Sequence, residues 1–410
     1  MSKLQELINR LCPNGVEFLA LGSICEIKTG KGITKKDAEK GGNFPIISGG
    51  QTPMGFFHIS NRKANTVTIS RVGAYAGFVS YIKEDFYLND KCFSIIPNTR
   101  QIFVPFLFYF LKHIEEKIRG LQSEGGVPTI NTQKVGALMI PVPPIEVQEE
   151  IVKILDRFSD YAAELQAELQ ARREQYEYYR NLLLTFNPSA CGCGTDDKQE
   201  GNVTTWGGHS YKINWKTMEE VFEFRNGYTP SKNIPKYWEG GTIPWFRMED
   251  IRDFGRILSD SYQHITADAI KGKGLFEKNS FILATTATIG EHALIIADSL
   301  ANQQFTNLKV RKSLSDKLVT KFIYYYLFIV DEFCKNNTNV SGFASVDMGK
   351  LKKMPFPIPP LELQEKIVAI LDRFETLVND LSQGLPAEIA AVREQYEYYR
   401  NQLLTFKQLA

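Results

Sequence analysis

Lysine and glycine gather in one segment that could bind phosphate, the run TGKGITKK from Thr29 to Lys36. A Walker-type loop holds phosphate oxygens with backbone N–H groups, and it needs a second glycine directly before Lys-Ser or Lys-Thr at a set spacing. This segment lacks that glycine, so Gly30 and Gly32 are better explained as ordinary loop residues. The sequence therefore predicts no nucleotide-binding loop here.

Two cysteines, Cys191 and Cys193, could supply half of a metal site. No second ligand pair follows at zinc spacing, so a plain linker is the better interpretation, and the role of the two thiols stays open. The five histidines form no HxxxH pair, and no methyltransferase-type Asn-Pro-Pro-aromatic run, nuclease set or catalytic triad stands out. A chain of 410 residues without such a set is more typical of a binding or scaffolding protein than of an enzyme.

The strongest pattern is an internal repeat. REQYEYYRN runs from Arg173 to Asn181 and again from Arg393 to Asn401, and LLTF closes both copies. Upstream, VPPIEVQEEIVKILDRF (142–158) matches IPPLELQEKIVAILDRF (358–374), and a weaker match continues into the preceding regions. Self-similarity at a long, fixed distance indicates duplicated architecture. The order is a variable domain, a helical block, a second variable domain and a second helical block.

The helical blocks have the apolar spacing of a coiled coil. In the first block, apolar or aromatic residues alternate in steps of four and three from Ile151 to Phe186, broken only by Arg172, over about five heptads. Pro143 and Pro144 prevent an earlier helix start, and Asn187-Pro188 should end the helix. From position 148 to 186 it would be about 58 Å long.

The second block repeats this seam but contains four extra residues, which form a stutter at Gly384 to Pro386. Pro386 should kink the helix or start a new one. The nearest partner for each seam is the other helix of the same chain, paired antiparallel with it. The alternatives are that each seam packs on its own variable domain or on another copy of the chain.

The variable domains are predicted to be mixed α/β, with short strands and one buried helix each. The fold class is α+β: two α/β domains separated by a pair of long antiparallel coiled-coil helices, with an internal pseudo-two-fold repeat. The expected strands are 67–70, 78–82, 93–96, 281–284 and 293–296, and the expected buried helices are 103–118 and about 319–330. The expected domains are 1–141, helix 142–186, linker 187–211, 212–357 and helix 358–410.

Composition is that of an ordinary soluble globular protein, with 23% charged and 43% hydrophobic residues. No apolar run reaches a membrane span of roughly 18 residues, and the N-terminus has no signal-peptide core. Six scattered cysteines favour a reducing, cytoplasmic compartment. The net charge of +1 gives no support of its own to a nucleic-acid partner, but the helical blocks are acid-rich and leave basic residues to the variable domains.

The repeated order of Pro-Pro, Gln-x-x-Ile-Val-x-Ile-Leu-Asp-x-Phe, QYEYYR and LLxF resembles the specificity subunit of type I restriction–modification systems over essentially the whole chain. NGYTPS (226–231), YW (237–238) and IPW (243–245) resemble the opening of a target-recognition domain. The first domain departs from this pattern, because it has GKGITK (30–35) and lacks Thr-Pro-Ser.

The resemblance implies that each variable domain reads half of a split sequence in double-stranded DNA. The helices then act as a ruler across an unread spacer and bind two modification subunits, which hold S-adenosylmethionine. Restriction subunits add ATP- and Mg-dependent translocation and cleavage. The chain itself would be a non-catalytic, cofactor-free protein of the prokaryotic cytoplasm. The alternatives are a DNA-independent coiled-coil adaptor or a specificity subunit that serves another restriction class.

Candidate base readers are chosen for side chains that can bond base edges. In the first domain they are Lys31, Gln51, Arg71 and Asn89; in the second they are Ser231, Lys232, Arg247, Asn302 and Gln303. Residues of the repeat that lie off the apolar seam are candidates for partner contacts, namely Tyr178, Arg180, Tyr398 and Arg400. The sequence does not identify the DNA sequence that is read or the spacer length.

Overall fold

The computed structural model describes residues 3–38, 42–123, 126–186, 203–206, 208–339, 344–380 and 382–409. The chain forms two compact units: unit 1 comprises Met1–Ala167 and Ala387–Ala410, and unit 2 comprises Glu168–Pro386. Each unit therefore contains one variable region and part of both helical blocks. The predicted helix stop at Asn187-Pro188 and the thiols of Cys191 and Cys193 lie outside the described residues.

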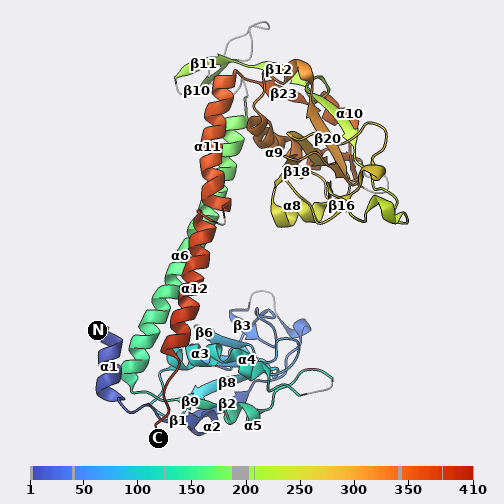
Figure 1. The fold of residues 1–410 in the computed structure, drawn as a ribbon. Coiled ribbons are helices and arrows are strands. Elements are labelled where there is room, and N and C mark those ends of the chain that lie inside the picture. Colours follow the sequence, from blue (N-terminus) through green and yellow to red (C-terminus); the bar gives the residue numbers. More distant parts are fainter. Residues whose placement is uncertain are drawn as a thin grey trace. The chain divides into compact units, whose positions relative to one another are not determined.

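A four-stranded and a three-stranded sheet make up most of the variable region of unit 1, beside one two-stranded pair (Figure 1). The larger is antiparallel, and the smaller contains a parallel pair, β3 with β7. Helix α3 packs on β5 and β6, so Leu107 and Ile69 are fully buried. In sheet order the strands are β2 (Cys25–Thr29), β8 (Cys92–Pro97), β5 (Thr66–Ser70) and β6 (Val79–Ile82), then β4 (Phe56–Phe57), β3 (Phe44–Ile47) and β7 (Tyr87–Leu88). The other elements are α1 (Lys3–Leu11), β1 (Phe18–Ala20), α2 (Leu21–Ile24), η1 (Lys35–Asp37), α3 (Val104–His113), α4 (Glu115–Arg119), α5 (Thr132–Gly136) and β9 (Met139–Pro141).

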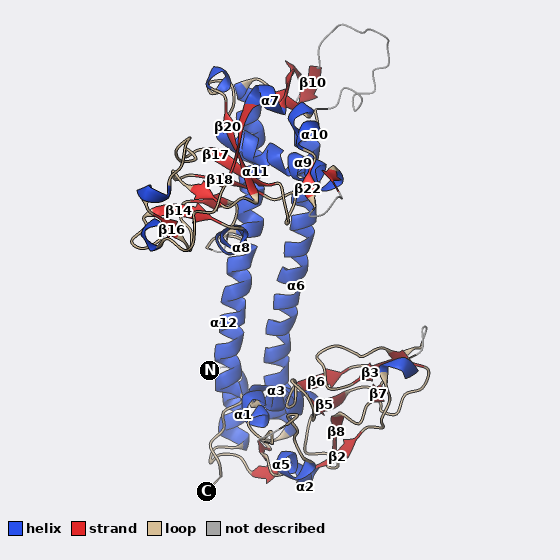
Figure 2. Ribbon diagram, turned by 90° about the vertical axis from the view of Figure 1, so that its right-hand side faces the viewer, coloured by secondary structure: helices blue, strands red, loops and turns tan. Residues whose placement is uncertain are grey.

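Unit 2 repeats this arrangement, with one additional strand at the edge of the larger sheet (Figure 2). In sheet order its strands are β13 (Phe222–Asn226), β20 (Phe305–Val310), β17 (Ser280–Ala284), β18 (His292–Ile295) and β15 (Ile257–Leu258), then β16 (His264–Ile265), β14 (Ile243–Phe246) and β19 (Leu300–Ala301). The other elements are β12 (Asn214–Thr217), α7 (Met218–Val221), η3 (Pro235–Tyr237), α8 (Met248–Phe254), η4 (Ala267–Ala269), η5 (Lys312–Leu314), α9 (Thr320–Asn336), β21 (Thr338–Asn339), β22 (Ser345–Val346), α10 (Met348–Lys353) and β23 (Pro355–Ile358).

The repeat extends to backbone details that the sequence comparison did not include. Asn65 and Asn279, directly before β5 and β17, both adopt a positive φ, at 59° and 64°. All five predicted strands are confirmed within one or two residues. The predicted helix 103–118 is instead two helices, because the backbone leaves helical geometry at Ile114 between α3 and α4. Within the expected linker 187–211 lies β10 (Val203–Trp206), which forms a hairpin with β11 (His209–Lys212).

The first helical block is one continuous helix, α6 (Ile145–Leu184), which begins directly after the proline pair as predicted. In unit 1 it pairs with α12 (Leu385–Leu403), where Phe158 and Tyr399 stack at 5.3 Å. In unit 2 it pairs with α11 (Leu361–Asn379), where Tyr179 and Phe374 stack at 5.8 Å. Later positions on α6 face earlier positions of the second block, so the predicted antiparallel intramolecular pair is confirmed (Figures 1 and 2).

The four extra residues break the second block into two helices. Helix α11 ends at Asn379, and α12 starts at Leu385 with Pro386 in its first turn, where a missing N–H costs no hydrogen bond. Gly384 is required in the break, because a Cβ there would lie 2.4 Å from the carbonyl oxygen of Thr376. Of the two predicted effects of Pro386, the new helix start is the one observed. In the described part of the chain no helix is both long and apolar enough to cross a membrane.

Candidate nucleic-acid interface

Three strand-end loops of unit 1 meet around the turn that follows β7. The backbone N–H of Lys31 donates to the carbonyl of Leu88 at 3.0 Å, and that of Arg71 donates to the carbonyl of Lys91 at 2.8 Å. The N–H of Asn89 donates to the last residue of β3 at 2.9 Å. We call residues 30–33, 71–73 and 88–92 loop cluster 1.

Unit 2 builds the same cluster from different side chains. Tyr228 donates to Ala301 at 2.9 Å, and Thr285 donates to Gln304 at 2.9 Å, both between backbone atoms. The N–H of Asn302 donates to the last residue of β14 at 3.0 Å. We call residues 227–229, 285–287 and 301–304 loop cluster 2. The backbone bonds are conserved between the units, whereas Lys31 is replaced by tyrosine and Arg71 by threonine.

One glycine in each cluster allows these loops to approach closely. A Cβ at Gly30 would lie 2.1 Å from the carbonyl oxygen of Leu88, and one at Gly227 would lie 2.2 Å from that of Asn302. Any other residue would push the loop away from the turn. The sequence-based interpretation of Gly30 as a loop glycine is therefore confirmed.

The predicted readers of the first domain are placed in three different ways. Lys31 is exposed on loop cluster 1, and the partly exposed guanidinium of Arg71 lies there too, 3.3 Å from the carbonyl oxygen of Asp90. Gln51 is exposed on the loop after β3, outside the cluster. Asn89 is only 1% exposed, and its amide donates to the carbonyl of Ile33 at 2.7 Å. Its side chain holds the turn, so a base contact would require breaking that bond.

The predicted readers of the second domain divide similarly. Gln303 is exposed, although its Oε1 accepts a bond from Thr229 at 2.5 Å. Asn302 is bonded within its own turn, like Asn89, through Oδ1 to the N–H of Gln304. Arg247 caps α8 and pairs with Glu249 at 2.7 Å. Ser231 and Lys232 are exposed on the loop before η3.

Lys232 also lines a pocket that the sequence did not predict. This pocket of about 480 Å³, here called the Trp238 pocket, is lined by Lys232, Pro235, Trp238, Glu239, Gln263 and His264. Gln263 has a buried Oε1 without a hydrogen-bond partner among the described residues, so this oxygen could accept a bond from an external donor. His264 Nε2 lies 2.6 Å from Asp260, whose pKa is lowered by the N–H of Ser261 and by this contact.

The position of His264 carries a different side chain in unit 1. The pairing of Pro45 with Phe56 corresponds to that of Pro244 with His264, so Phe56 takes the imidazole's place. Phe56 is 49% exposed. The two units thus present an aromatic ring and an imidazole at the same position of the same fold. Nothing in the local sequence distinguishes Gln263 or His264 from other loop residues, which is why sequence reasoning missed them.

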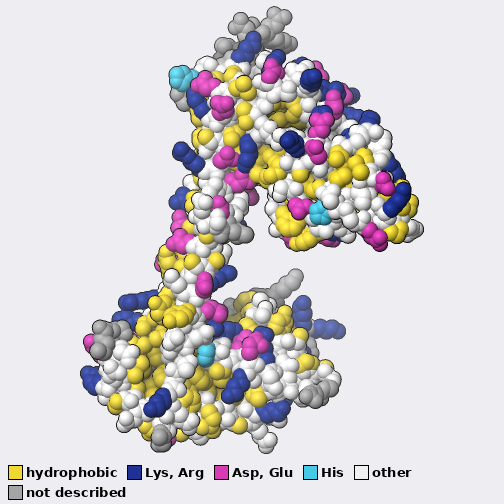
Figure 3. Space-filling model, in the orientation of Figure 1, with side chains coloured by type: hydrophobic (Ala, Val, Ile, Leu, Met, Phe, Trp, Pro, Cys, Tyr) yellow, Lys and Arg dark blue, Asp and Glu magenta, His cyan; other side chains and the backbone are white. Residues whose placement is uncertain are grey.

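Charge is mixed over the visible surface. Figure 3 shows Lys and Arg side chains interspersed with Asp and Glu over both units, without one continuous basic face. This agrees with the net charge of +1. Extensive phosphate neutralisation by this chain alone is therefore not favoured on this face.

The predicted partner residues separate into exposed tyrosines and partly buried arginines. Tyr178 and Tyr398 are 64% and 60% exposed, and each packs edge-on against the next tyrosine of its helix. Arg180 lies over the ring of Phe328 at 4.0 Å, so it faces its own domain. Arg400 lies over Tyr396 at 5.7 Å and, after the larger effect of burial, helps to lower the pKa of His113.

The described residues contain no group of three or more His, Cys, Asp or Glu side chains arranged to hold a metal ion. Four of the cysteines are described, and all four are buried free thiols. Burial raises the pKa of Cys92 to about 11, so this thiol is protonated and weakly nucleophilic at neutral pH.

Comparison with known proteins agrees with this architecture. Two solved structures match nearly the whole chain and show the same fold. One is a type I restriction–modification S subunit from M. genitalium, with a TM-score of 0.53, 15% identity and coverage of 95% of this chain and 96% of that chain. The other comes from work on complex assembly and conformational transition of the type I R-M system, with a TM-score of 0.60, 19% identity and coverage of 96% and 98%.

Curated relatives match at the level of sequence. The EcoprrI specificity subunit of Escherichia coli is 48% identical over 204 residues, which cover 48% of this chain and only 51% of that relative. The EcoR124I/EcoR124II specificity subunit of the same species is 28% identical over 428 aligned positions, covering 99% and 97%. The family model for the type I restriction modification DNA specificity domain matches residues 13–174 and 212–391. These two matches take in both variable regions and most of both helical blocks, and the chain belongs to that family.

Proposed function

We propose that this chain is the DNA-recognition subunit of a type I restriction–modification enzyme. Each unit reads one half of a split site in double-stranded DNA, and the paired helices set the unread spacer. The observation that carries the proposal is the pair of loop clusters. Their backbone bonds are the same, but their side chains differ. Unit 1 has the exposed Lys31 where unit 2 has the partly buried Tyr228, and the partly exposed Arg71 where unit 2 has the buried Thr285. Two copies of one scaffold with different surfaces suit two different half-sites.

The chemistry of these positions supports base reading. Arginine, lysine and glutamine can make two bonds to a base edge in the major groove. In unit 1 we propose Lys31, Arg71 and the more distant Gln51 as readers. In unit 2 we propose Ser231, Lys232, Arg247 and Gln303 together with Gln263 and His264 of the Trp238 pocket. Asn89 and Asn302 then act indirectly, by holding the turns that carry neighbouring side chains.

The helical blocks supply the partner surfaces. Tyr178 and Tyr398 occupy equivalent, exposed positions on the two blocks, so they offer two copies of one surface to two copies of one partner. Exposed aromatic side chains are enriched in protein interfaces. We propose that two modification subunits, which bind S-adenosylmethionine, dock there. Restriction subunits supply ATP- and Mg-dependent cleavage, and this chain contributes no catalytic group.

Affinity for DNA is expected to depend on these partners. A net charge of +1 gives the isolated chain little general attraction to phosphate. Tight binding then requires basic surface on the modification subunits. Half-sites about one turn of B-DNA apart, roughly 34 Å, face the same side of the duplex, which a rigid helical spacer can match.

Sequencing of DNA methylation with and without this gene tests the proposal. The expected result is a bipartite adenine-methylation motif that is present with the gene and disappears on its deletion. A methylation pattern that is identical in both strains, although both modification and restriction genes are expressed, would exclude the recognition role and favour a DNA-independent adaptor.

A further inference from the structure

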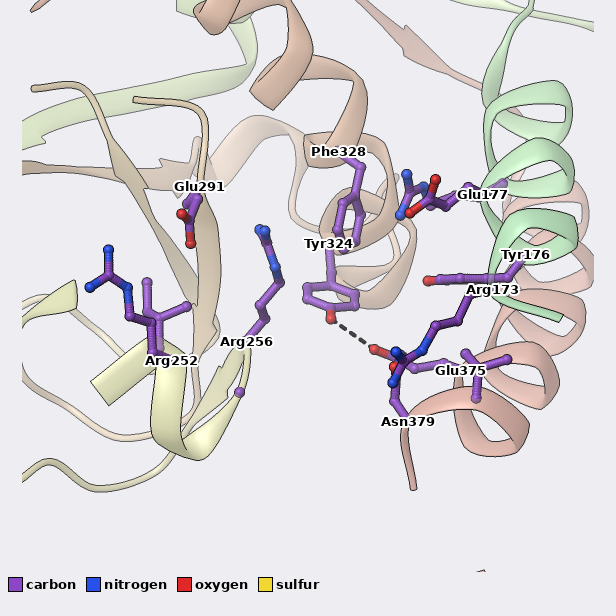
Figure 4. A pocket seen from close by; sticks show the side chains of 14 residues that line it. Arg173, Tyr176, Glu177, Arg252, Arg256, Glu291, Tyr324, Phe328, Glu375 and Asn379 are labelled. Carbon is purple, nitrogen blue, oxygen red and sulfur yellow. Dashed lines mark hydrogen bonds between the residues drawn. The ribbon is translucent and has the colours of Figure 1, made fainter. Parts of the chain in front are cut away.

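A pocket of about 560 Å³ lies where the second variable region meets the helices, entirely within unit 2. Figure 4 shows side chains entering it from α6, α9, α11 and the turn after α8. Its rim carries both signs of charge, including Arg173, Arg252, Glu177 and Glu291. Such a mixed rim does not favour one small anion or cation. The contacts around this pocket hold the variable region to the helices.

One contact in the wall of the pocket is an aromatic ring between two guanidinium groups. Arg180 of α6 lies 4.0 Å from the ring centre of Phe328, and Arg256 lies 4.9 Å from it. Arg256 is itself held at 3.1 Å by Asp331, a 3% exposed carboxylate that also lies 2.7 Å from His292. This Arg180–Phe328–Arg256 stack therefore joins the coiled coil, α9 and the sheet of the variable region.

A second set of bonds fixes α9 on α11. Tyr324 and Tyr325 both donate to Glu375, at 2.8 and 2.7 Å. Tyr325 also donates to Asp372. Burial, then the nearby Glu375 charge, raises the pKa of both tyrosines, so they stay protonated donors at neutral pH. Tyr324 and Phe328 are neighbours on one face of α9, with ring centres 5.7 Å apart, so these bonds and the stack lie side by side.

Unit 1 lacks this stack at the corresponding place. The repeat puts Lys112 at the position of Phe328, and Lys112 bonds to Glu115 at 2.6 Å instead. Of the tyrosine–carboxylate bonds, the counterpart seen among the described residues is Tyr109 with Asp156, at 2.6 Å. The two recognition domains are thus fastened to their helices in different ways. None of these residues belongs to the loop clusters that we propose to read bases.

We infer that Arg180, Phe328 and Arg256 are positioning residues that fix the angle of the second recognition domain on its helices and so limit which spacer lengths the enzyme accepts. This inference rests on the proposed function. Helix length sets the distance between the half-sites, and the stack fixes the orientation of the second recognition domain on its helices. A change of one base pair in the spacer both shifts and rotates a half-site. A domain that is held rigidly on its helices therefore binds the displaced half-site less well.

The Phe328→Lys variant gives unit 2 the residue of unit 1 and places a third cation between two arginines. The complex with two modification subunits is assayed for methylation on DNAs that carry both half-sites with spacers of the native length and one base pair longer or shorter. We expect methylation at the altered spacers, relative to methylation at the native spacer, to rise about fivefold. A change of this size is what the loss of one cation–π stack would cause. Both half-site sequences should stay the same.

Phe328→Tyr and Glu291→Gln are the matched controls. The first keeps an aromatic ring between the arginines, and the second changes the charge of the same pocket without touching the stack, so both should keep the native spacer preference. Phe328→Leu serves as a second test if the lysine variant does not assemble. An equal loss of methylation at every spacer, or an unchanged preference, would overturn the positioning role. If the wild-type complex methylates no bipartite site, the proposed function itself fails.

Discussion

Gln148 and Gln364 make the same three hydrogen bonds in the two units. Gln148 Oε1 accepts from the N–H of Phe103 at 2.8 Å, and its Nε2 donates to the carbonyls of Gln101 and Pro143, both at 2.7 Å. Gln364 bonds to Val319, Lys317 and Pro359 in the same way, at 2.8, 2.8 and 2.7 Å. Each side chain is fully buried, and it ties the start of a long helix to the start of the buried helix of its domain.

Replacing either glutamine with leucine should destabilise its unit strongly. Gln148→Leu keeps the approximate volume but leaves one backbone N–H and two carbonyl groups without their partner. The expected loss is roughly 2–4 kcal/mol, since each unsatisfied buried group costs about 1–3 and water can relieve some of it. Thermal unfolding of the isolated chain measures the effect. Gln170→Ala, an exposed change on the same helix, is the control and should cost less than about 0.5 kcal/mol. Equal melting temperatures for Gln148→Leu and Gln170→Ala would contradict the role of Gln148 in holding the helix to its domain.

Removing the exposed tyrosines should weaken assembly without unfolding the chain. Tyr178→Ala and Tyr398→Ala each remove one of two equivalent contacts, so each single variant should keep one full-affinity site for a modification subunit. At the altered site we expect roughly 5–30-fold weaker binding, the effect of losing a central aromatic contact. Analytical ultracentrifugation of titrated complexes separates the two sites. Tyr262→Ala, an exposed tyrosine of the second variable region, is the control. Two unaltered sites in the double variant would rule out this surface.

Single substitutions should alter one half-site at a time. Arg71→Ala lies in unit 1 and Gln263→Ala in unit 2, so each variant serves as the control for the other. Loss of a two-bond contact to a base lowers discrimination by about 1–3 kcal/mol at one position. Methylation sequencing should show one degenerate position in one half-site and an intact second half-site. Degeneracy in both half-sites from one substitution would mean that the units do not read independently.

The helical blocks could be predicted closely because their period and their duplication are properties of the sequence itself. Apolar spacing located the α6 seam, and the four extra residues located the break before Pro386. Five strands of the variable regions could also be predicted, since β-branched runs between glycine and asparagine are local features. The sequence did not predict the break at Ile114, where a single residue leaves helical geometry, or the β10–β11 hairpin at the end of the expected linker.

The candidate site could be predicted only in part, because side-chain availability depends on tertiary bonds. Asn89 and Lys31 are both suitable for base contacts by type, yet the first is buried and bonded whereas the second is exposed. The sequence does not predict a role for Gln263, because the pocket around it is assembled from two loops that are far apart in the sequence. Arg180 lies off the apolar seam, as predicted, but its face of the helix is covered by Phe328.

Stability of unit 1 should respond to mild acid through His113. Its pKa is lowered, first by burial and then by the charge of Arg400. The unfolded chain therefore binds a proton to this side chain before the folded chain does, and stability falls as pH drops below the unfolded value of about 6.5. His113→Gln removes this contribution. Thermal unfolding at pH 7.5 and pH 5.5 should show a smaller decline for the variant than for the wild type. An identical decline in both would contradict the assignment.

Lengthening α6 should lengthen the spacer. AELQ occurs twice in tandem on α6, at 163–170. A third copy extends the helix by about 6 Å and turns it by about 40°. On B-DNA, 6 Å is nearly two base pairs, so the preferred spacer should grow by one or two base pairs. Both half-sites should stay the same, because the loop clusters are untouched. Methylation sequencing measures the gap directly. A changed half-site with an unchanged gap would show that α6 contributes to reading and does not act as a ruler.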